Sequence, residues 1–131
     1  MATSAVCLIE DDEDTRRVER WLFEGEGYRV LEAANGSAGL AVLRRSLERL
    51  VVLLDYQLPE LDGCDVLRRV THEATLRERH AVIVLTASPQ RAMAECGKLL
   101  DELGVGLVPK PFDLDAIVAM VGEAAERLTA S

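Results

Sequence analysis

The chain has few cysteines, and their arrangement narrows what it can be. The three cysteines, Cys7, Cys64 and Cys96, are odd in number, far apart in the sequence, and form no Cys-x-x-Cys pair. This pattern argues against a disulfide framework and indicates small buried or half-buried thiols in a reducing compartment. A chain of 131 residues buries enough surface to fold without a covalent or metal staple.

Long apolar runs are also missing. No segment approaches the roughly 20 apolar residues that a membrane helix needs. The first residues, Met1 to Ser4, lack the basic region and apolar stretch of a signal peptide. The sequence therefore predicts a cytoplasmic protein without a membrane partner.

A basic surface is the third absence. The chain has 15 basic and 23 acidic residues and a net charge of −8. Residues 10–14 are five consecutive acids, so much of the imbalance is local. Without a stripe of Lys and Arg to neutralise phosphates, direct binding to nucleic acid is not expected.

Short apolar segments alternate with amphipathic segments along the whole chain. The apolar segments predict strands over residues 5–9, 28–33, 51–54, 81–85 and 105–108. The amphipathic segments predict helices over residues 14–26, 37–49, 63–75 and 88–103, and from 113 onward. Such alternation predicts a single α/β domain over residues 1–131, a doubly wound parallel sheet with helices on both faces and right-handed crossovers.

Periodicity also predicts which side chains face inward. Val18 and Trp21 fit the inner stripe of the first helix, and we expect both in the core. Inward positions are also expected for Leu47, Met93 and Leu114. The two histidines, His72 and His80, are expected at the surface.

Polar residues follow four of the five predicted strands. They are the acidic run with Asp11 and Asp12, then Asp55, Thr86 and Lys110. The carboxyl ends of parallel strands share one edge of the sheet, where ligands bind. We therefore expect three carboxylates, a hydroxyl and an ammonium to meet there.

This combination suggests a particular chemistry. Two carboxylates about 4 Å apart repel by roughly 4 kcal/mol at an effective dielectric constant near 20. Mg²⁺ fits such a site, because it prefers oxygen ligands and leaves positions open for phosphate. Lys110 and Thr86 suit the oxygens of a phosphoryl group, and Asp55 is the best placed nucleophile. The residues thus suggest phosphoryl transfer onto an aspartate.

At these positions the chain resembles the receiver domain of response regulators, the phospho-accepting module of two-component signalling. The matching segments are residues 8–12, 53–63, 84–87 and 110–112, in that order. The resemblance covers essentially the whole chain and implies a single-domain receiver. It further implies the flavodoxin-like (βα)₅ fold with strand order 2-1-3-4-5.

The resemblance also implies a role for each matching residue. Asp55 matches the phospho-acceptor, Thr86 the switch hydroxyl, and Lys110 the lysine that pairs with the phosphoryl group. Asp12 matches a direct Mg²⁺ ligand and Asp11 an acid that acts mainly through water. The backbone carbonyl of Gln57 matches a further metal ligand, and the Lys110–Pro111 peptide is expected to be cis.

The function implied by the resemblance is signalling rather than enzymatic turnover. A sensor histidine kinase or a histidine phosphotransfer protein would supply the phosphoryl group, with Mg²⁺ as the cofactor. The only activities of the chain itself would be self-phosphorylation and dephosphorylation. A downstream protein would read the change at the face formed by the fourth helix, fifth strand and fifth helix of the family fold.

Two residues depart from the family pattern. Leu107 stands where many receivers have an aromatic residue, so the usual coupling to Thr86 lacks a ring. Pro109 removes an N–H from the fifth strand, which an edge strand tolerates. With prolines on both sides, Lys110 is expected to have a restrained backbone that prepositions its ammonium.

Three other functions compete with this interpretation. A pseudo-receiver would bind partners without phosphorylation, but it would not need the full set of site residues. An aspartate-nucleophile phosphatase has a DxDx[TV] motif, whereas here Thr15 comes one place too early and Asp55 would have no role. A flavin-binding flavodoxin-like protein needs a phosphate loop where this chain has five acids.

Overall fold

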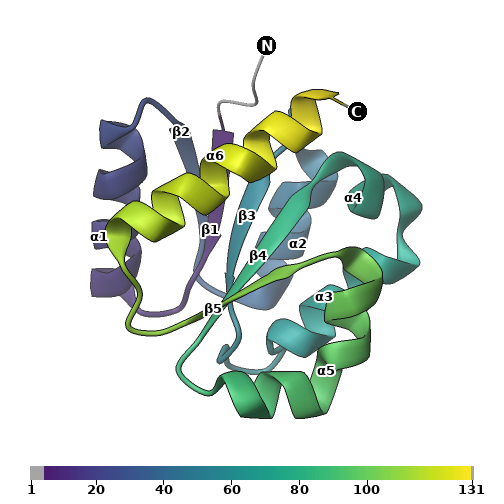
Figure 1. Cartoon of the computed structure of the whole chain (residues 1–131). Coiled ribbons are helices and arrows are strands. Elements are labelled where there is room, and N and C mark those ends of the chain that lie inside the picture. Colours follow the sequence, from purple (N-terminus) through teal and green to yellow (C-terminus); the bar gives the residue numbers. More distant parts are fainter. Residues whose placement is uncertain (1–4, 131) are drawn as a thin grey trace.

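The computed structural model describes residues 5–130, which form a five-stranded parallel sheet in the order β2-β1-β3-β4-β5 (Figure 1). The strands are β1 (Ala5–Ile9), β2 (Arg29–Ala33), β3 (Val51–Asp55), β4 (Ala81–Thr86) and β5 (Gly106–Pro109). The helices are α1 (Glu13–Gly25), α2 (Gly36–Arg45), α3 (Gly63–His72), α4 (Ala74–Arg79), α5 (Pro89–Leu103) and α6 (Leu114–Ala130). The predicted fold class and strand order are confirmed. The segment without a signal-peptide pattern, residues 1–4, lies outside the described residues.

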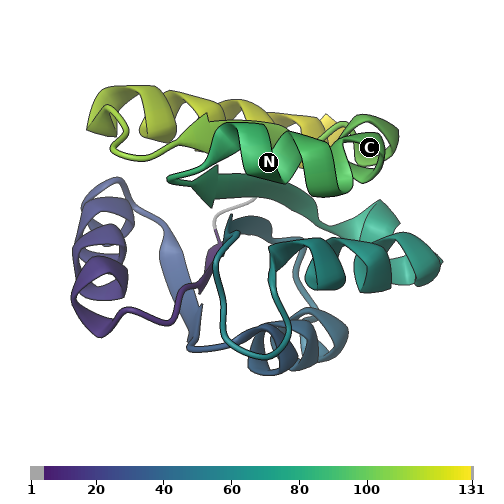
Figure 2. The ribbon, with the colours of Figure 1, turned by 90° about the horizontal axis from the view of Figure 1, so that it is seen from below.

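Two apolar layers enclose the sheet. One layer packs α1 and α6 against the face that carries Leu8 and Leu53. The other packs α2, α3, α4 and α5 against the face that carries Ile9 and Leu54. Figure 2 shows these helices on either side of the strands. Every residue of β1 and β3 is buried, which explains why these strands are continuous apolar runs in the sequence.

The register of the two central strands places the site. Ile9 of β1 pairs with Leu54 of β3, so the residues that follow, Glu10 and Asp55, leave the sheet side by side. The strand order makes β1 and β3 neighbours although a whole β-α unit separates them in sequence. This is the switch point of the doubly wound fold, where ligands bind.

A glycine lets the loop after β3 fold back against the site. The N–H of Gly63 donates to the carbonyl of Tyr56 at 2.9 Å. A Cβ on Gly63 would lie 2.8 Å from the Cα of Tyr56, so a side chain there would push the loop away. Asp62 then caps α3, in a capping box with Asp65.

Several side chains expected in the core are exposed. Trp21 is 79% exposed and Val18 55%, because α1 buries Glu19 and Phe23 instead, on the opposite side of the helix from Trp21. Because the charged Glu19 lies on the buried face of α1, the pattern of apolar residues does not show which face of this helix is buried. Met93, Leu47 and Leu114 are exposed as well.

Helix boundaries account for part of this difference. The second helix ends at Arg45 rather than at residue 49, so Leu47 lies in the connection to β3. The third helix ends at His72, and a short additional helix, α4, follows it. Among the described residues, no helix is both long enough and apolar enough to cross a membrane.

His80 is buried, so its predicted surface position is wrong. Its Nδ1 accepts a hydrogen bond from the N–H of Leu50, and its Nε2 lies 3.0 Å from the carbonyl oxygen of Leu43. Together these contacts require a neutral ring with the proton on Nε2. Burial lowers the pKa of His80. The ring thereby ties the end of α2 to the start of β3 and β4.

Candidate functional site

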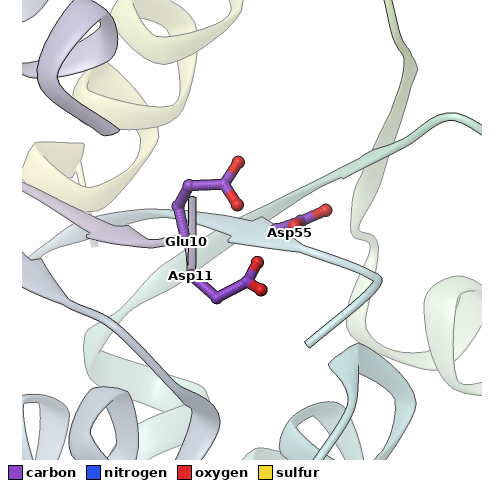
Figure 3. A group of neighbouring side chains, drawn as sticks. All are labelled: Glu10, Asp11 and Asp55. Carbon is purple, nitrogen blue, oxygen red and sulfur yellow. The ribbon is translucent and has the colours of Figure 1, made fainter. Parts of the chain in front are cut away.

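Three carboxylates meet at the carboxyl ends of β1 and β3. Glu10, Asp11 and Asp55 each offer one oxygen, and these oxygens all lie within 4.8 Å of one another. Figure 3 shows Glu10 and Asp11 leaving the end of β1 toward the side where Asp55 leaves β3. Glu10 and Asp55 are buried, whereas Asp11 is exposed, so the cluster runs from the sheet edge to solvent.

Lys110 is the cation of this cluster. Its Nζ lies 3.0 Å from Oε1 of Glu10 and 3.4 Å from Oδ1 of Asp55. Burial alone would lower the pKa of Lys110, but the hydrogen bond to Glu10 and the charges of Asp55 and Glu10 raise it overall. Three carboxylates and one ammonium leave a net charge of −2 when all are ionised.

The backbone around Lys110 is held as well. Its N–H donates to the carbonyl oxygen of Thr86 at 2.7 Å, and the Lys110–Pro111 peptide is cis, as the resemblance predicts. Pro109 ends the edge strand β5, where the missing N–H removes no hydrogen bond between strands. The restraint expected from the two flanking prolines stays a prediction.

Thr86 is completely buried at the end of β4. Its hydroxyl oxygen accepts a hydrogen bond from the N–H of Ser88, at 2.9 Å. Ser88 immediately precedes α5. The hydroxyl expected to sense the phosphoryl group is therefore joined to the start of α5.

Asp12 has a different partner from the other acids. Its carboxylate accepts from the N–H of Thr15 at 3.0 Å and from the Thr15 hydroxyl, and it caps the N-terminus of α1. The hydrogen bonds from Thr15 lower the pKa of Asp12. The structure thus brings Asp11 and Asp55 together as predicted, and it adds Glu10 to them in place of Asp12.

Glu10 was not identified from the sequence as a site residue. Burial is the main cause that raises the pKa of Glu10, and the hydrogen bond with Asp55 raises the pKa further. The hydrogen bond with Lys110 lowers it. Two features of the sequence favour Glu10 over Asp12. Glu10 directly follows the apolar run of β1, at the edge of the sheet. Asp12 directly precedes a helix, where aspartate is a favoured capping residue.

The remaining predicted residue, Gln57, lies in the loop after β3. Its side chain is exposed, and its backbone N–H donates to Oδ1 of Asp55 at 3.4 Å. The N–H of Tyr56 donates to the carbonyl oxygen of Leu85 at 2.9 Å, which fixes the beginning of the same loop against β4. The loop therefore stays close to the carboxylates.

A further carboxyl group, Glu19, lies behind the cluster on α1. It is 4% exposed, and its Oε2 has no hydrogen-bond partner among the described residues. Burial raises the pKa of Glu19 to about 7, and the negative charge of Glu10 adds to the shift. The positive charge of Lys110 works against it. The apolar periodicity of α1 predicts only apolar side chains on its buried face, so it gives no sign of Glu19.

The donor set fits a hard divalent cation. Carboxylate oxygens on two adjacent strand ends, with the outermost one exposed, are the ligands that Mg²⁺ takes in phosphoryl-transfer sites. The repulsion among the carboxylates is only partly offset by Lys110. A bound cation would remove the rest.

Comparison with protein families identifies the family of the chain. Residues 6–122 match the model of the response regulator receiver domain. The matched range holds all the site residues described above. The resemblance predicted from the sequence is therefore confirmed.

Curated relatives and solved structures agree. Sporulation initiation phosphotransferase F of Bacillus subtilis is 32% identical over 117 residues, which cover 89% of this chain and 90% of that protein. The transcriptional regulatory protein CpxR of Klebsiella pneumoniae is 34% identical over 88% of this chain, but only 47% of that protein is matched. The chain thus spans about half the length of that regulator.

Among structures, the receiver domain of a sensor histidine kinase from Pseudomonas aeruginosa has a TM-score of 0.81 at 24% identity, with 95% of this chain and 99% of that chain covered. It is described with a magnesium ion coordinated in its active site cleft. A CheY-like receiver domain protein from Methanospirillum hungatei has a TM-score of 0.82 at 22% identity, with 97% and 98% covered. At these identities the likeness shows the fold.

Proposed function

The chain belongs to the family of response regulator receiver domains, and on that premise we propose that Asp55 accepts a phosphoryl group from a phosphohistidine. The donor would be a sensor histidine kinase or a histidine phosphotransfer protein. The observation that carries this proposal is the position of Asp55, buried at the end of β3 between the Lys110 ammonium and two further carboxylates.

The step itself is a displacement at phosphorus. A carboxylate oxygen of Asp55 forms the new P–O bond, the P–N bond of the phosphohistidine breaks, and the imidazole leaves. Lys110 is already within reach of Asp55 Oδ1 and offers its ammonium to the transferred oxygens. Hydrolysis of the acyl phosphate by water would reset the site.

The proposed magnesium ligands are Asp11, Asp55 and the backbone carbonyl of Gln57, with Glu10 as the second acid. Glu10 and Asp11 replace the pair Asp11 and Asp12 that the resemblance implied, because Asp12 is engaged as the cap of α1. When bound, Mg²⁺ would neutralise charge on the carboxylates and on the phosphoryl oxygens. The role of the protein is to hold these oxygens close together.

The output would leave through the face formed by α5, β5 and α6. Thr86 would release the Ser88 N–H and donate to a phosphoryl oxygen, which changes the start of α5. Leu107 on β5 is half-buried and packs against the core, so an aliphatic side chain takes the position of the usual aromatic one. A downstream protein that binds this face is the proposed target.

The test is intact mass after incubation with acetyl phosphate. We expect the wild-type chain to gain one phosphoryl group with Mg²⁺ and none after the metal is chelated. Asp55→Asn should gain none in either condition. A chain that gains nothing, and whose thermal unfolding is unchanged by Mg²⁺ with a phosphoryl mimic, would be a pseudo-receiver that acts by binding alone.

The choice of acids has its own test. Glu10→Gln and Asp11→Asn should each raise the Mg²⁺ concentration needed for half-maximal phosphorylation by about tenfold or more, as loss of one charged contact of about 1.4 kcal/mol implies. Asp12→Asn is the matched control, since Asn also caps helices. If Asp12→Asn raises the required Mg²⁺ concentration and Glu10→Gln does not, the metal ligands are the pair Asp11 and Asp12.

A further inference from the structure

Two of the three thiols, far apart in sequence, meet in the structure. Cys64 is the second residue of α3, and Cys96 lies in the middle of α5. The sulfur of Cys64 lies 3.7 Å from the carbonyl oxygen of Glu95, the residue directly before Cys96, and the two cysteines are only 3% and 4% exposed. The third thiol, Cys7, is fully buried within β1, whose residues pair with β2 and β3.

The backbone of α5 is irregular at the same place. Cys96 has φ −143° and ψ 28°, which is not helical, so it divides α5 into two helical pieces. The first piece begins directly after Ser88, the residue bonded to Thr86. A covalent bond to Cys96 would therefore act between two parts of α5, the piece that begins after Ser88 and the piece that ends at Leu103.

Cys64 borders the surface, although it is itself only 3% exposed. It lines a surface cavity of about 260 Å³, together with Tyr56, Asp62, Arg68 and Glu95. The thiol donates to the carbonyl oxygen of Glu95 at 3.7 Å, and the hydroxyl of Tyr56 donates to the Glu95 carboxylate beside it.

We propose that Cys64 and Cys96 form a redox-active pair, which hydroperoxides convert to a disulfide between α3 and α5. Cys64 reacts first: its sulfur takes one oxygen from the hydroperoxide, which gives a sulfenic acid and, from hydrogen peroxide, one water. The sulfur of Cys96 then displaces the hydroxyl group, and the Cys96 proton leaves with it as a second water. Two thiols are oxidised and one peroxide is reduced, so the step is balanced.

The division of roles follows from the surroundings. Burial raises the pKa of Cys96 to about 12, and the neighbouring Cys64 thiol adds to the shift, so Cys96 is poorly suited to attack peroxide itself. Cys96 is not among the residues that line the cavity, whereas Cys64 is. The disulfide would hold α5 to α3 at Cys96. This does not depend on phosphorylation of Asp55.

The test uses the full chain, reduced and then treated with hydrogen peroxide. After the remaining thiols are alkylated, we expect one internal disulfide by intact mass and a Cys64–Cys96 linked peptide on non-reducing digestion. Cys7→Ser is the matched control and should form the same link. Addition of dithiothreitol should restore both thiols.

The variants test the order of events. In Cys96→Ser, Cys64 should be trapped by dimedone as a sulfenic acid, whereas in Cys64→Ser we expect Cys96 to stay unlabelled. The linked peptide in the wild-type chain decides the proposal even if one variant fails to fold. Oxidation of Cys64 to sulfinic acid without a link, or a link that involves Cys7, would overturn it.

Discussion

At the amino end of the sheet, the buried His80 ring is neutral and both of its nitrogens have backbone partners, from Leu50 and Leu43. At the carboxyl end, Glu10 and Asp55 share the ammonium of Lys110, and one buried oxygen of Glu19 has no hydrogen-bond partner among the described residues. Both places bury polar groups in one domain. Only the first gives every buried polar side-chain atom a hydrogen-bond partner among the described residues.

The difference separates stability from function. A buried polar group with its hydrogen bonds made contributes to the fold, and one without them lowers its stability. Like-charged groups at a strand edge destabilise the free protein, and a bound cation can recover that energy. The two ends should therefore respond in opposite ways to substitution.

The largest effect is expected for His80→Ala. It leaves the Leu50 N–H and the Leu43 carbonyl unpaired and opens a cavity, so the free energy of unfolding should fall by about 3–5 kcal/mol. Urea unfolding measures it, and exposed His72→Ala is the control. Phosphorylation by acetyl phosphate should persist wherever the variant is folded. A loss below about 1 kcal/mol would mean that the ring is not a structural link.

His80 also predicts a pH dependence with a definite sign. Burial lowers the pKa of its folded state below the ordinary value of 6.5. The unfolded chain therefore binds the proton more readily, and the stability should decline as pH falls below about 6.5. Urea unfolding at several pH values would show the decline in the wild-type chain. In His80→Ala this part of the decline should be absent.

Glu19→Gln should act in the opposite direction. The folded-state pKa of Glu19 is raised from 4.5 to about 7, so the wild-type chain loses stability as pH rises through this range. Gln carries no charge, and at pH 8 the variant should be more stable by about 2–3 kcal/mol. The gain should shrink toward pH 4.5 in urea unfolding. Exposed Glu24→Gln on the same helix should show no such pH-dependent gain.

Asp55→Asn should also stabilise the metal-free chain, by about 1–2 kcal/mol, because one charge leaves the carboxylate cluster while Lys110 keeps Glu10. Thermal unfolding with and without Mg²⁺ measures the effect. If Mg²⁺ binds this cluster, the ion should stabilise the wild-type chain more than the variant and reduce the gap. Destabilisation by Asp55→Asn would show that its contact with Lys110 outweighs the repulsion.

The smallest effect concerns Asp12. Asp12→Ala removes the cap of α1 and should cost about 1 kcal/mol, whereas Asp12→Asn should cost only a few tenths. Urea unfolding distinguishes the two. Equal losses for both variants would mean that the charge of Asp12, rather than its cap, stabilises the chain.

Much of the fold could be predicted because its central strands are buried on both faces and therefore read as apolar runs. Asp55, Thr86 and Lys110 end or follow apolar strands, so they could be placed at one edge of the sheet without coordinates. The misses have a common physical cause. Glu19 and His80 are polar residues in buried positions, and the partners of His80 come from segments distant in sequence, so no local pattern marks either residue.

The two candidate acidic pairs, Glu10 with Asp11 and Asp11 with Asp12, differ by a shift of one residue. Residues 10–14 are all acidic, and composition alone does not say which carboxylates face the sheet edge. In the structure β1 ends at Ile9 and Asp12 caps α1, which places Glu10 rather than Asp12 beside Asp55. The sequence contains both features, because the apolar run ends at Ile9 and aspartate is favoured directly before a helix.

The exposed Trp21 has a practical consequence. It is the single tryptophan of the chain, and it stands 79% exposed on α1. Since its indole is already largely in water, unfolding should change its emission only slightly, and intrinsic fluorescence would be a poor monitor of stability. A molecule that covers α1 would shift the emission to the blue. The protein thus carries its own optical reporter for whatever binds that helix.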